Sequence, residues 1–334
     1  KHKWRTLVAG SAALAFVAAT GLVVVNRADA SPGATFVVAA DGKATAHNCN
    51  SDTDTPYTTI GAAVAAAAAG DTVKVCAGEY DEDVTVDKAL TLKGAKYGDS
   101  VHARTFGSAN ESTVTGLVTI QAEGVRVEGF SLTNPNQGLG VLVKKTANDA
   151  VVKKNIIKTV GSNTFATPVV GVYLELGPDR VTVAGNAVSD IQSQNGSAQG
   201  VLVGDSTSGD PSVDVRIDNN KFMDITSVNR GAYGVQLNNG ASISATATGY
   251  TEAKVRGNTI KNLTGNWVHA IGLEGETPNA VVDNNTISNL TDSNPVPQAD
   301  VVGVFFEANV FFFTSEVNQN SLDVGATGFG IAVH

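Results

Sequence analysis

The sequence predicts an all-β fold, a single-stranded parallel β-helix, because two short motifs alternate along most of its length. The first motif is Gly-apolar-any-apolar, and the second is apolar-any-any-Asn-any-apolar. They alternate in a fixed order at steps of 27 to 38 residues, which is typical of a solenoid built from one coil per repeat. The first motif begins at Gly140, Gly171, Gly200, Gly234, Ala270 (a variant), Gly303 and Gly330, and the Asn of the second falls at Asn155, Asn186, Asn220, Asn258, Asn285 and Asn320.

Each repeat is interpreted as strand, turn, strand and loop. The apolar residues of a motif lie two apart, so they point to one face of a strand and into a shared interior. The Asn lies between two inward residues, at a bend that we expect to require the left-handed conformation that Asn tolerates. On coils stacked ~4.8 Å apart, such Asn side chains can hydrogen-bond to one another as a ladder. Helical periodicity is absent from this region.

The first 30 residues have the pattern of a signal peptide. Residues 1–5 are basic, residues 6–25 are apolar or small, and residues 28–30 form an Ala-Asp-Ala cleavage site. An uncleaved membrane anchor is the alternative, and no later segment is apolar enough to cross a bilayer. We therefore expect a secreted or cell-surface protein that touches a membrane only through this segment. The net charge of −9 argues against nucleic acid as a partner.

Residues 31–77 are predicted to form an N-terminal cap, and residues 78–334 the β-helix itself. Export favours a disulfide between Cys49 and Cys76 over a metal or redox pair. Between these cysteines, residues 58–70 predict the one short helix, with Thr at its start, an Ala-rich body and Gly70 as its stop. A solenoid needs its end covered, because the terminal coil otherwise exposes apolar interior and unpaired strand edges.

Residues 78–94, Gly-Glu-Tyr-Asp-Glu-Asp-Val-Thr-Val-Asp-Lys-Ala-Leu-Thr-Leu-Lys-Gly, follow Ala-Ala-Gly-Asp-Thr-Val-Lys-Val. This stretch resembles the first coils of pectin-lyase-like β-helix proteins, which include pectinesterases and secreted proteins related to the periplasmic NosD factor. The resemblance implies a right-handed helix, here of about eight coils. It implies no activity, because this superfamily mixes lyases, hydrolases, esterases and proteins without known chemistry.

The catalytic segments of those enzymes do not appear in this chain. The Gln-Asp and Asp-Phe-(Ile/Val)-Phe-Gly segments of pectinesterases have no counterpart, nor does the Trp-Ile-Asp-His segment of pectate lyases. Residues 216–218 read Arg-Ile-Asp, where a polygalacturonase would have Arg-Ile-Lys. The catalytic residues are therefore unknown from the resemblance.

Strand geometry indicates a candidate site on the outward face of the first-motif strands. Glu274 and Glu307 are predicted on consecutive coils, about 5 Å apart, with His269 nearby. Paired carboxylates at such a spacing serve retaining glycosidases, and they are also good ligands for calcium. Ordinary solvated positions on an acidic protein are the third interpretation. The candidate binding residues are Tyr173, Glu175, Asn238, Glu274, Glu276, Phe305 and Glu307, of which Glu274 and Glu307 are the candidate calcium ligands and catalytic residues.

The leading functional hypothesis is an exported protein that binds polysaccharide along its parallel groove, or that serves as a cell-surface or structural module. The alternative is a polysaccharide lyase or glycoside hydrolase acting on acidic or cell-wall glycans. A third hypothesis is self-association through the C-terminal end. Residues 330–334 are predicted as an uncovered strand close to the aromatic stretch 305–313, so we expect a second copy or further C-terminal residues to cover them.

Overall fold

The computed structural model describes residues 33–41, 49, 56–175, 177–204, 212–239, 253–275, 280–294, 301–307, 315–325 and 328–333. The chain divides into two units, residues 1–31 and residues 32–334, and every described residue lies in the second. The predicted signal peptide, Glu276 and the three consecutive Phe residues at 311–313 lie outside the described residues. No helix in the described ranges is long and apolar enough to cross a membrane.

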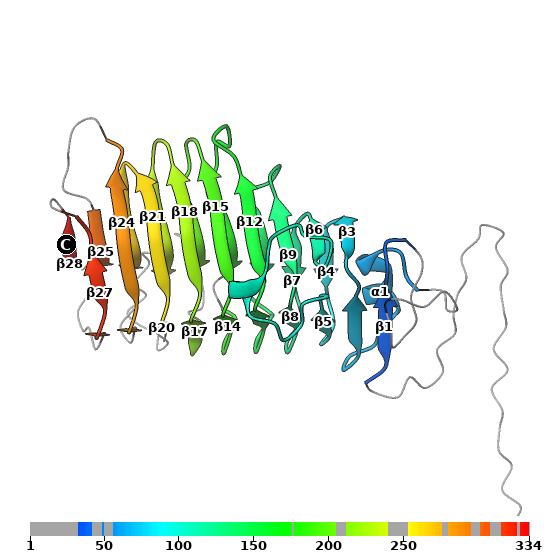
Figure 1. Ribbon diagram of the computed structural model, residues 1–334. Helices are drawn as coiled ribbons and strands as arrows, with labels where there is room; N and C mark the ends of the chain where they lie inside the picture. The colour runs from blue at the N-terminus through cyan, green and yellow to red at the C-terminus, as the bar shows by residue number, and fades with distance from the viewer. Residues whose placement is uncertain are drawn as a thin grey trace, which may run out of the picture. The chain divides into compact units, whose positions relative to one another are not determined.

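Three sheets, in which all strands run parallel, form the described part of the chain. From β3 onward the chain visits three sheets, named B, C and A, in turn, so paired strands lie three places apart in the sequence (Figure 1). The exception is β1, which pairs with β2. Sheet A consists of β1 (Thr35–Val38), β2 (Thr72–Val75), β5 (Thr91–Lys93), β8 (Arg126–Glu128), β11 (Val151–Lys153), β14 (Thr182–Ala184), β17 (Val215–Asp218), β20 (Ala253–Arg256), β23 (Val281–Asp283) and β26 (Glu316–Asn318). Sheet B consists of β3 (Gly78–Asp81), β6 (Ser112–Thr115), β9 (Ser131–Asn134), β12 (Ile156–Gly161), β15 (Ala187–Ser193), β18 (Lys221–Ser227), β21 (Thr259–Gly265), β24 (Thr286–Asp292) and β27 (Ser321–Asp323). Sheet C consists of β4 (Val84–Val86), β7 (Val118–Ile120), β10 (Leu139–Val143), β13 (Val169–Leu174), β16 (Ala198–Val203), β19 (Gly231–Asn239), β22 (Trp267–Gly275), β25 (Val301–Phe306) and β28 (Phe329–Val333).

This topology confirms the predicted parallel β-helix, and its three parallel sheets fit the right-handed, pectin-lyase-like form. Sheets B and C each contain nine described strands, one more than the predicted number of about eight coils. The difference arises at the N-terminal end, because the turns β3–β5 and β6–β8 contain neither motif in full. Counting motifs therefore underestimates the stack.

The interior is filled by the apolar residues that the motifs predict. In sheet C, Val201 and Val203 are at most 1% exposed, and Phe222 of β18 is fully buried. A Cβ atom added at Gly200 would lie 2.4 Å from the Phe222 ring and 2.5 Å from the Gly234 carbonyl oxygen. The Gly of the first motif is thus required because interior side chains and the next coil approach its backbone closely.

The predicted Asn ladder is present. Each ladder Asn from Asn155 to Asn285 donates its backbone N–H to the Oδ1 of the next ladder Asn at 2.8–2.9 Å. Each Nδ2 also donates to that Oδ1 and to a backbone carbonyl one coil earlier. The ladder Asn residues from Asn155 to Asn285 are at most 1% exposed. Because every donor and acceptor in the row is used, these buried amides carry little desolvation penalty.

The predicted backbone conformation of the ladder Asn was wrong. The left-handed residue is the one before it, for example Lys154 (φ 52°), Asn219 (φ 56°) and Asn284 (φ 55°). There is a physical reason why the residue before the Asn, and not the Asn itself, is left-handed. The preceding residue turns the chain from sheet A into sheet B, which leaves the Asn side chain pointing inward, where it reaches the next coil.

The N-terminal cap contains the short helix α1 (Ile60–Ala66), which is capped by the side chain of Thr59. The Glu82 carboxylate accepts from the N–H groups of Ile60 and Gly61 at 2.7 and 2.9 Å, at the positive end of the helix. The helix ends four residues before Gly70, because Ala67 is already extended (ψ 153°). Gly70 (φ 89°) instead forms the turn into β2. Strands β1 and β2 of the cap belong to sheet A, so the backbone pairing of the β-helix continues into the cap.

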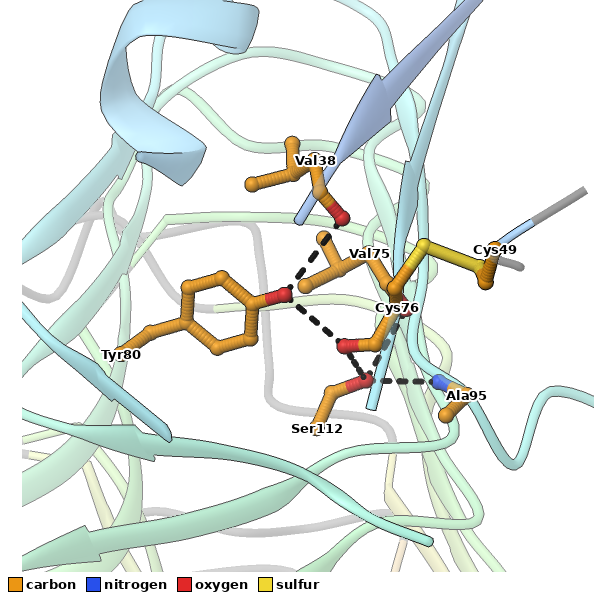
Figure 2. The surroundings of a disulfide bond; sticks show 7 residues. All are labelled: Val38, Cys49, Val75, Cys76, Tyr80, Ala95 and Ser112. Atoms are coloured by element: carbon orange, nitrogen blue, oxygen red, sulfur yellow. Dashed lines mark hydrogen bonds between the residues drawn. A yellow bond between two sulfur atoms is a disulfide. The ribbon is translucent and has the colours of Figure 1, made fainter. Parts of the chain in front are cut away.

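The Cys49–Cys76 disulfide is present, with its Cα atoms 5.6 Å apart. Figure 2 shows that it joins residue 49 to the chain just after β2, where the Cys76 carbonyl accepts from two hydroxyls. Tyr80 and Ser112 each donate to this carbonyl at 2.9 Å, and Ser112 Oγ accepts from the N–H of Ala95 at 2.8 Å. The disulfide is thereby linked by hydrogen bonds to the first two turns of the stack.

A longer excursion between β5 and β6 contains the 3-10 helix η1 (Val101–Ala103). It is held by Arg104, whose guanidinium pairs with Glu111 at 2.6 Å and donates to the carbonyls of Phe130 and Lys154. Both charged side chains are at most 3% exposed. Because the pair is buried and fully hydrogen-bonded, it serves to anchor this segment against the turns that follow.

Candidate functional site

Tyr173 and Phe305, two candidate residues predicted on the outward face of the first-motif strands, belong to one row of sheet C. Tyr173 pairs with Leu202, Leu202 with Gln236, Gln236 with Gly272, and Gly272 with Phe305. Side chains in such a row lie on consecutive coils, at the ~4.8 Å spacing of neighbouring strands.

The predicted Glu274–Glu307 neighbourhood is also present. Asn238 pairs with Glu274 across β19 and β22. The Glu307 N–H donates to the Leu273 carbonyl at 3.0 Å, which places Glu307 on the coil after Glu274 in the same row. Glu274 is 14% exposed at its side chain, so this row is partly shielded from water.

Glu175 lies away from Glu274 and Glu307 on the outward face of sheet C. Its carboxylate forms an ion pair with Lys144 at 2.6 Å and accepts from the N–H of Lys145 at 3.1 Å. These three residues line a cavity of about 350 Å³ together with Asp87, Gln121 and Thr146. Glu175 lies three coils before Glu274 in the row, so the predicted residues divide between two locations.

A further outward row was not predicted, apart from His269. It contains Gln199, Tyr233 and His269, which pair directly across β16, β19 and β22. The residues are 4%, 4% and 7% exposed, although they point away from the core. In β19 both Ala232 and Val235 are fully buried, so the inward–outward alternation breaks between them. Strict alternation from Val235 would have placed Tyr233 inside. The break falls at Gly234, the glycine of the first motif, where an added Cβ atom would lie 2.6 Å from the buried Ile260 side chain.

Glu274 lies at the centre of these rows. Its Oε2 accepts from Gln236 Nε2 at 2.5 Å. Trp267 Nε1 donates to the Tyr233 hydroxyl at 2.9 Å. Burial raises the pKa of Tyr233 well above its usual value, and the nearby Glu274 charge raises it further.

Three rings pack beside the carboxylate. His269 stacks on Phe305, with ring centroids 4.0 Å apart and planes 16° apart, and meets Tyr233 edge-on at 5.5 Å. His269 Nδ1 lies 3.6 Å from Glu274 Oε1, which is too long for a hydrogen bond. The imidazole is therefore positioned by ring packing rather than by the carboxylate.

Two glycines make this packing possible. A Cβ atom at Gly231 would lie 2.0 Å from Trp267 Nε1, so any other residue there would displace the indole. A Cβ atom at Gly272 would lie 3.2 Å from the Tyr233 ring and 3.3 Å from Glu274 Oε1. The sequence therefore provides open positions under both the indole and the phenol.

The calcium prediction for Glu274 and Glu307 has no further support in the described ranges, where no three His, Cys, Asp or Glu side chains gather as metal ligands. Calcium takes six to eight oxygen ligands. Glu274 already accepts from Gln236, so a cation there would compete with a protein donor. The calcium site stays a prediction.

No protein-family model and no curated protein matches the chain. Among solved structures, it is similar to the pectin methylesterase from Aspergillus niger, with 14% identity, a TM-score of 0.49, and coverage of 87% of this chain and 86% of that one. It is also similar to the pectin methylesterase from carrot (12%, 0.48, 91% and 90%) and to a rhamnogalacturonan lyase (14%, 0.44, 86% and 88%). At these identities and TM-scores, nothing about the activity of this chain follows from the likeness.

Proposed function

We propose that the protein binds a polysaccharide along the outward face of sheet C. The proposed site is the Glu274 cluster, defined as Gln199, Tyr233, Gln236, Trp267, His269, Glu274 and Phe305. The observation that carries the proposal is a chain of two amides that ends on the Glu274 carboxylate, with the Trp267–Tyr233 hydrogen bond and three packed rings beside it, on four consecutive coils.

The chemistry of the cluster suits a sugar ring. A pyranose presents hydroxyl donors and acceptors at its edge and apolar C–H groups on its faces. Amide and carboxylate groups satisfy the former, and aromatic rings such as Phe305 and His269 cover the latter. Binding sites commonly combine an apolar surface with a few precisely oriented polar groups, and these are held by mutual hydrogen bonds.

The repeat of the fold suits a polymer. Outward rows continue on both sides of the cluster at the ~4.8 Å coil spacing, so a chain of sugars laid across the strands would meet one coil after another. Tyr173 and Leu202 extend the Gln236 row toward the N-terminal end. The disulfide accords with an oxidising compartment outside the cytoplasm, where such polymers occur.

The test is a binding panel of neutral and uronate polysaccharides with the purified protein, with and without calcium, measured by titration calorimetry. We expect at least one glycan to bind, and Glu274→Gln to weaken that binding at least about tenfold, which corresponds to ~1.4 kcal/mol. The matched control is Glu79→Gln, an exposed glutamate of β3 in sheet B. Equal weakening by both variants, or no binding to any glycan, would contradict the proposal.

A second candidate function is glycan cleavage, favoured by the placement of Glu274 and Glu307 on adjacent coils. Retaining glycosidases use two carboxyl groups about 5–5.5 Å apart. The same panel distinguishes this function: new reducing ends indicate hydrolysis, and ultraviolet absorbance from unsaturated ends indicates a lyase. If hydrolysis occurs, Glu307→Gln should abolish it without abolishing binding.

A further inference from the structure

Basic side chains gather on the outward face of sheet A, on three neighbouring strands near its N-terminal end. Lys93 of β5 and Lys153 of β11 lie in one row, on either side of Glu128 of β8. Strands β5, β8 and β11 each carry a cation, on coils ~4.8 Å apart. The sheet A basic patch is defined as Lys93, Lys96, Arg126, Lys153 and Lys154. Within residues 91–98, 126–128 and 151–154, Glu128 is the only carboxylate, so the patch is positive on a chain of net charge −9.

The carboxylate of Glu128 is buried and holds two cations of the patch in place. The Glu128 side chain is 3% exposed and accepts from Arg126 Nε at 2.8 Å. Lys154 Nζ lies 3.8 Å from Glu128 Oε1 and donates to the Gly98 carbonyl. The side chains of Arg126 and Lys154 remain 32% and 30% exposed. Glu128 therefore orients these two cations while leaving part of each accessible to a partner.

The other three cations of the patch have no described counter-ion. Lys93, Lys96 and Lys153 form no ion pair with any residue that the structure describes. Each ammonium group has three N–H donors and acts as a compact point charge. Sulfate and phosphate groups suit such a surface, because their several oxygens accept from different directions. A planar carboxylate instead matches the fork of an Arg side chain.

An exposed aromatic ring lies among these cations. Tyr97 is 41% exposed, and its ring centroid lies 4.7 Å from Lys93 Nζ and 5.9 Å from Arg126 Cζ. The turn that carries Tyr97 packs against the end of β8, where a Cβ atom added at Gly129 would lie 2.3 Å from the Tyr97 nitrogen. The ring is thus held in place with its face open to solvent. Such a ring can stack on a sugar while the neighbouring cations bind the anionic groups of that sugar.

We propose that the sheet A basic patch is a second binding surface, which takes a polysaccharide bearing sulfate or phosphate groups. It is separate from the Glu274 cluster and does not depend on the function proposed for sheet C. A linear polymer laid across β5, β8 and β11 would meet a cation on every coil. Proteins that hold single-stranded nucleic acid stack several bases on several rings, whereas this patch offers Tyr97 alone. The disulfide also accords with an oxidising compartment, where polysaccharides are the commoner polymer.

The experiment compares neutral dextran with dextrans of the same length that carry sulfate, phosphate or carboxymethyl groups at equal charge density. Affinities are measured by titration calorimetry at about 0.15 M salt, which screens long-range attraction between exposed charges. The test variant combines Lys93→Gln with Lys153→Gln. The matched control combines Lys221→Gln with Lys261→Gln, at two lysines of β18 and β21 in sheet B. Both double variants have the same net charge, so a difference between them reports where the polymer binds. Lys153→Gln alone is added because Lys93 also contacts Tyr97.

We expect the sulfated or the phosphorylated dextran to bind the wild-type protein at least about tenfold more tightly than neutral dextran. The test variant should lose at least about tenfold of this affinity, and Lys153→Gln alone should lose several-fold. The slope of log affinity against log salt should become shallower by about one or more in the test variant. The control should change neither quantity.

Equal losses in the test variant and the control, or no preference for the charged dextrans, would overturn the proposal. Equally tight binding of the carboxymethyl dextran would overturn the assignment to sulfate or phosphate. Tighter binding of single-stranded DNA or of anionic phospholipid vesicles would overturn the assignment to a polysaccharide. Glu274→Gln should leave the affinity for charged dextran unchanged, so failure at sheet A and failure at sheet C are distinguishable.

Discussion

Trp267 Nε1 donates a 2.9 Å hydrogen bond to the hydroxyl of Tyr233, which lies one coil earlier on the neighbouring strand. The contact depends on the absence of a side chain at Gly231, over which the indole lies. It fixes the Tyr233 hydroxyl near Glu274, whose negative charge raises the pKa of Tyr233. The proposed site is thus a network across coils rather than a set of separate side chains.

This contact predicts the effect of Tyr233→Phe. The variant keeps the ring but leaves the Trp267 N–H without its acceptor. We expect a loss of about 1–3 kcal/mol in unfolding free energy, the usual cost of leaving buried polar groups unpaired. Denaturant unfolding checks it, with Tyr97→Phe, at an exposed tyrosine, as the control. A variant as stable as the control would mean that the Tyr233 hydroxyl is not held as described.

The Asn ladder makes a second prediction. Asn220→Ala removes the amide that accepts from the Asn186 N–H and donates to Asn258 Oδ1, so groups on both neighbouring coils lose partners. We expect a loss of about 1–3 kcal/mol, measured as a lower denaturation midpoint. Asn229→Ala, which removes an exposed amide bonded to Asn195, should have little effect. Similar midpoints for the two variants would contradict the role of the ladder.

Tyr80 predicts how stability depends on pH. Burial raises the pKa of Tyr80 from 10.0 to about 12. Above about pH 10 the unfolded chain releases this proton while the folded protein retains it, so the unfolded state binds fewer protons and stability falls as pH rises toward about 12. The contribution of Tyr80 to the free energy of unfolding is fully present below about pH 10. Tyr80→Phe should make the decline between pH 10 and 12 shallower in urea unfolding. An unchanged slope would contradict the assigned burial.

The disulfide predicts a local effect on stability. It closes a loop with a sequence separation of 27 residues, for which chain-entropy reasoning gives roughly 3.5 kcal/mol. Replacing both cysteines by serine should therefore loosen β1 and β2 first, because solenoids gain stability from nearest-neighbour contacts. Hydrogen exchange should increase in those strands and remain unchanged in β16 and β19. Equally faster hydrogen exchange in all strands would indicate that the disulfide stabilises the whole β-helix instead.

The last strand of sheet C predicts self-association. Phe329, Ile331 and Val333 of β28 are 50%, 51% and 69% exposed, and β28 is the outermost of the described strands of sheet C. Exposed apolar side chains on an unpaired edge favour pairing with another chain. We expect concentration-dependent growth in light scattering, which Ile331→Lys should suppress. A monomer at all concentrations would contradict this expectation.

The fold could be predicted from the sequence because its motifs are local and repeated. Gly200 and Asn220 recur in step with apolar residues two or three positions away, and the coil geometry then determines their neighbours. The outward row from Tyr173 to Phe305 followed from the same periodicity. The position of Tyr233 could not be predicted, since it depends on a break in alternation between Ala232 and Val235. The role of Trp267 depends on empty space above Gly231, which appears only once the coils are stacked.

Hydrogen exchange on addition of the best-bound glycan tests the central claim, binding along sheet C, most directly. We predict slower exchange in β16, β19, β22 and β25, with no change in β17, β20 and β23 of sheet A, and loss of the protection in Glu274→Gln. Protection confined to sheet A or sheet B, or the same protection in wild type and variant, would show that the glycan binds elsewhere and would contradict the account.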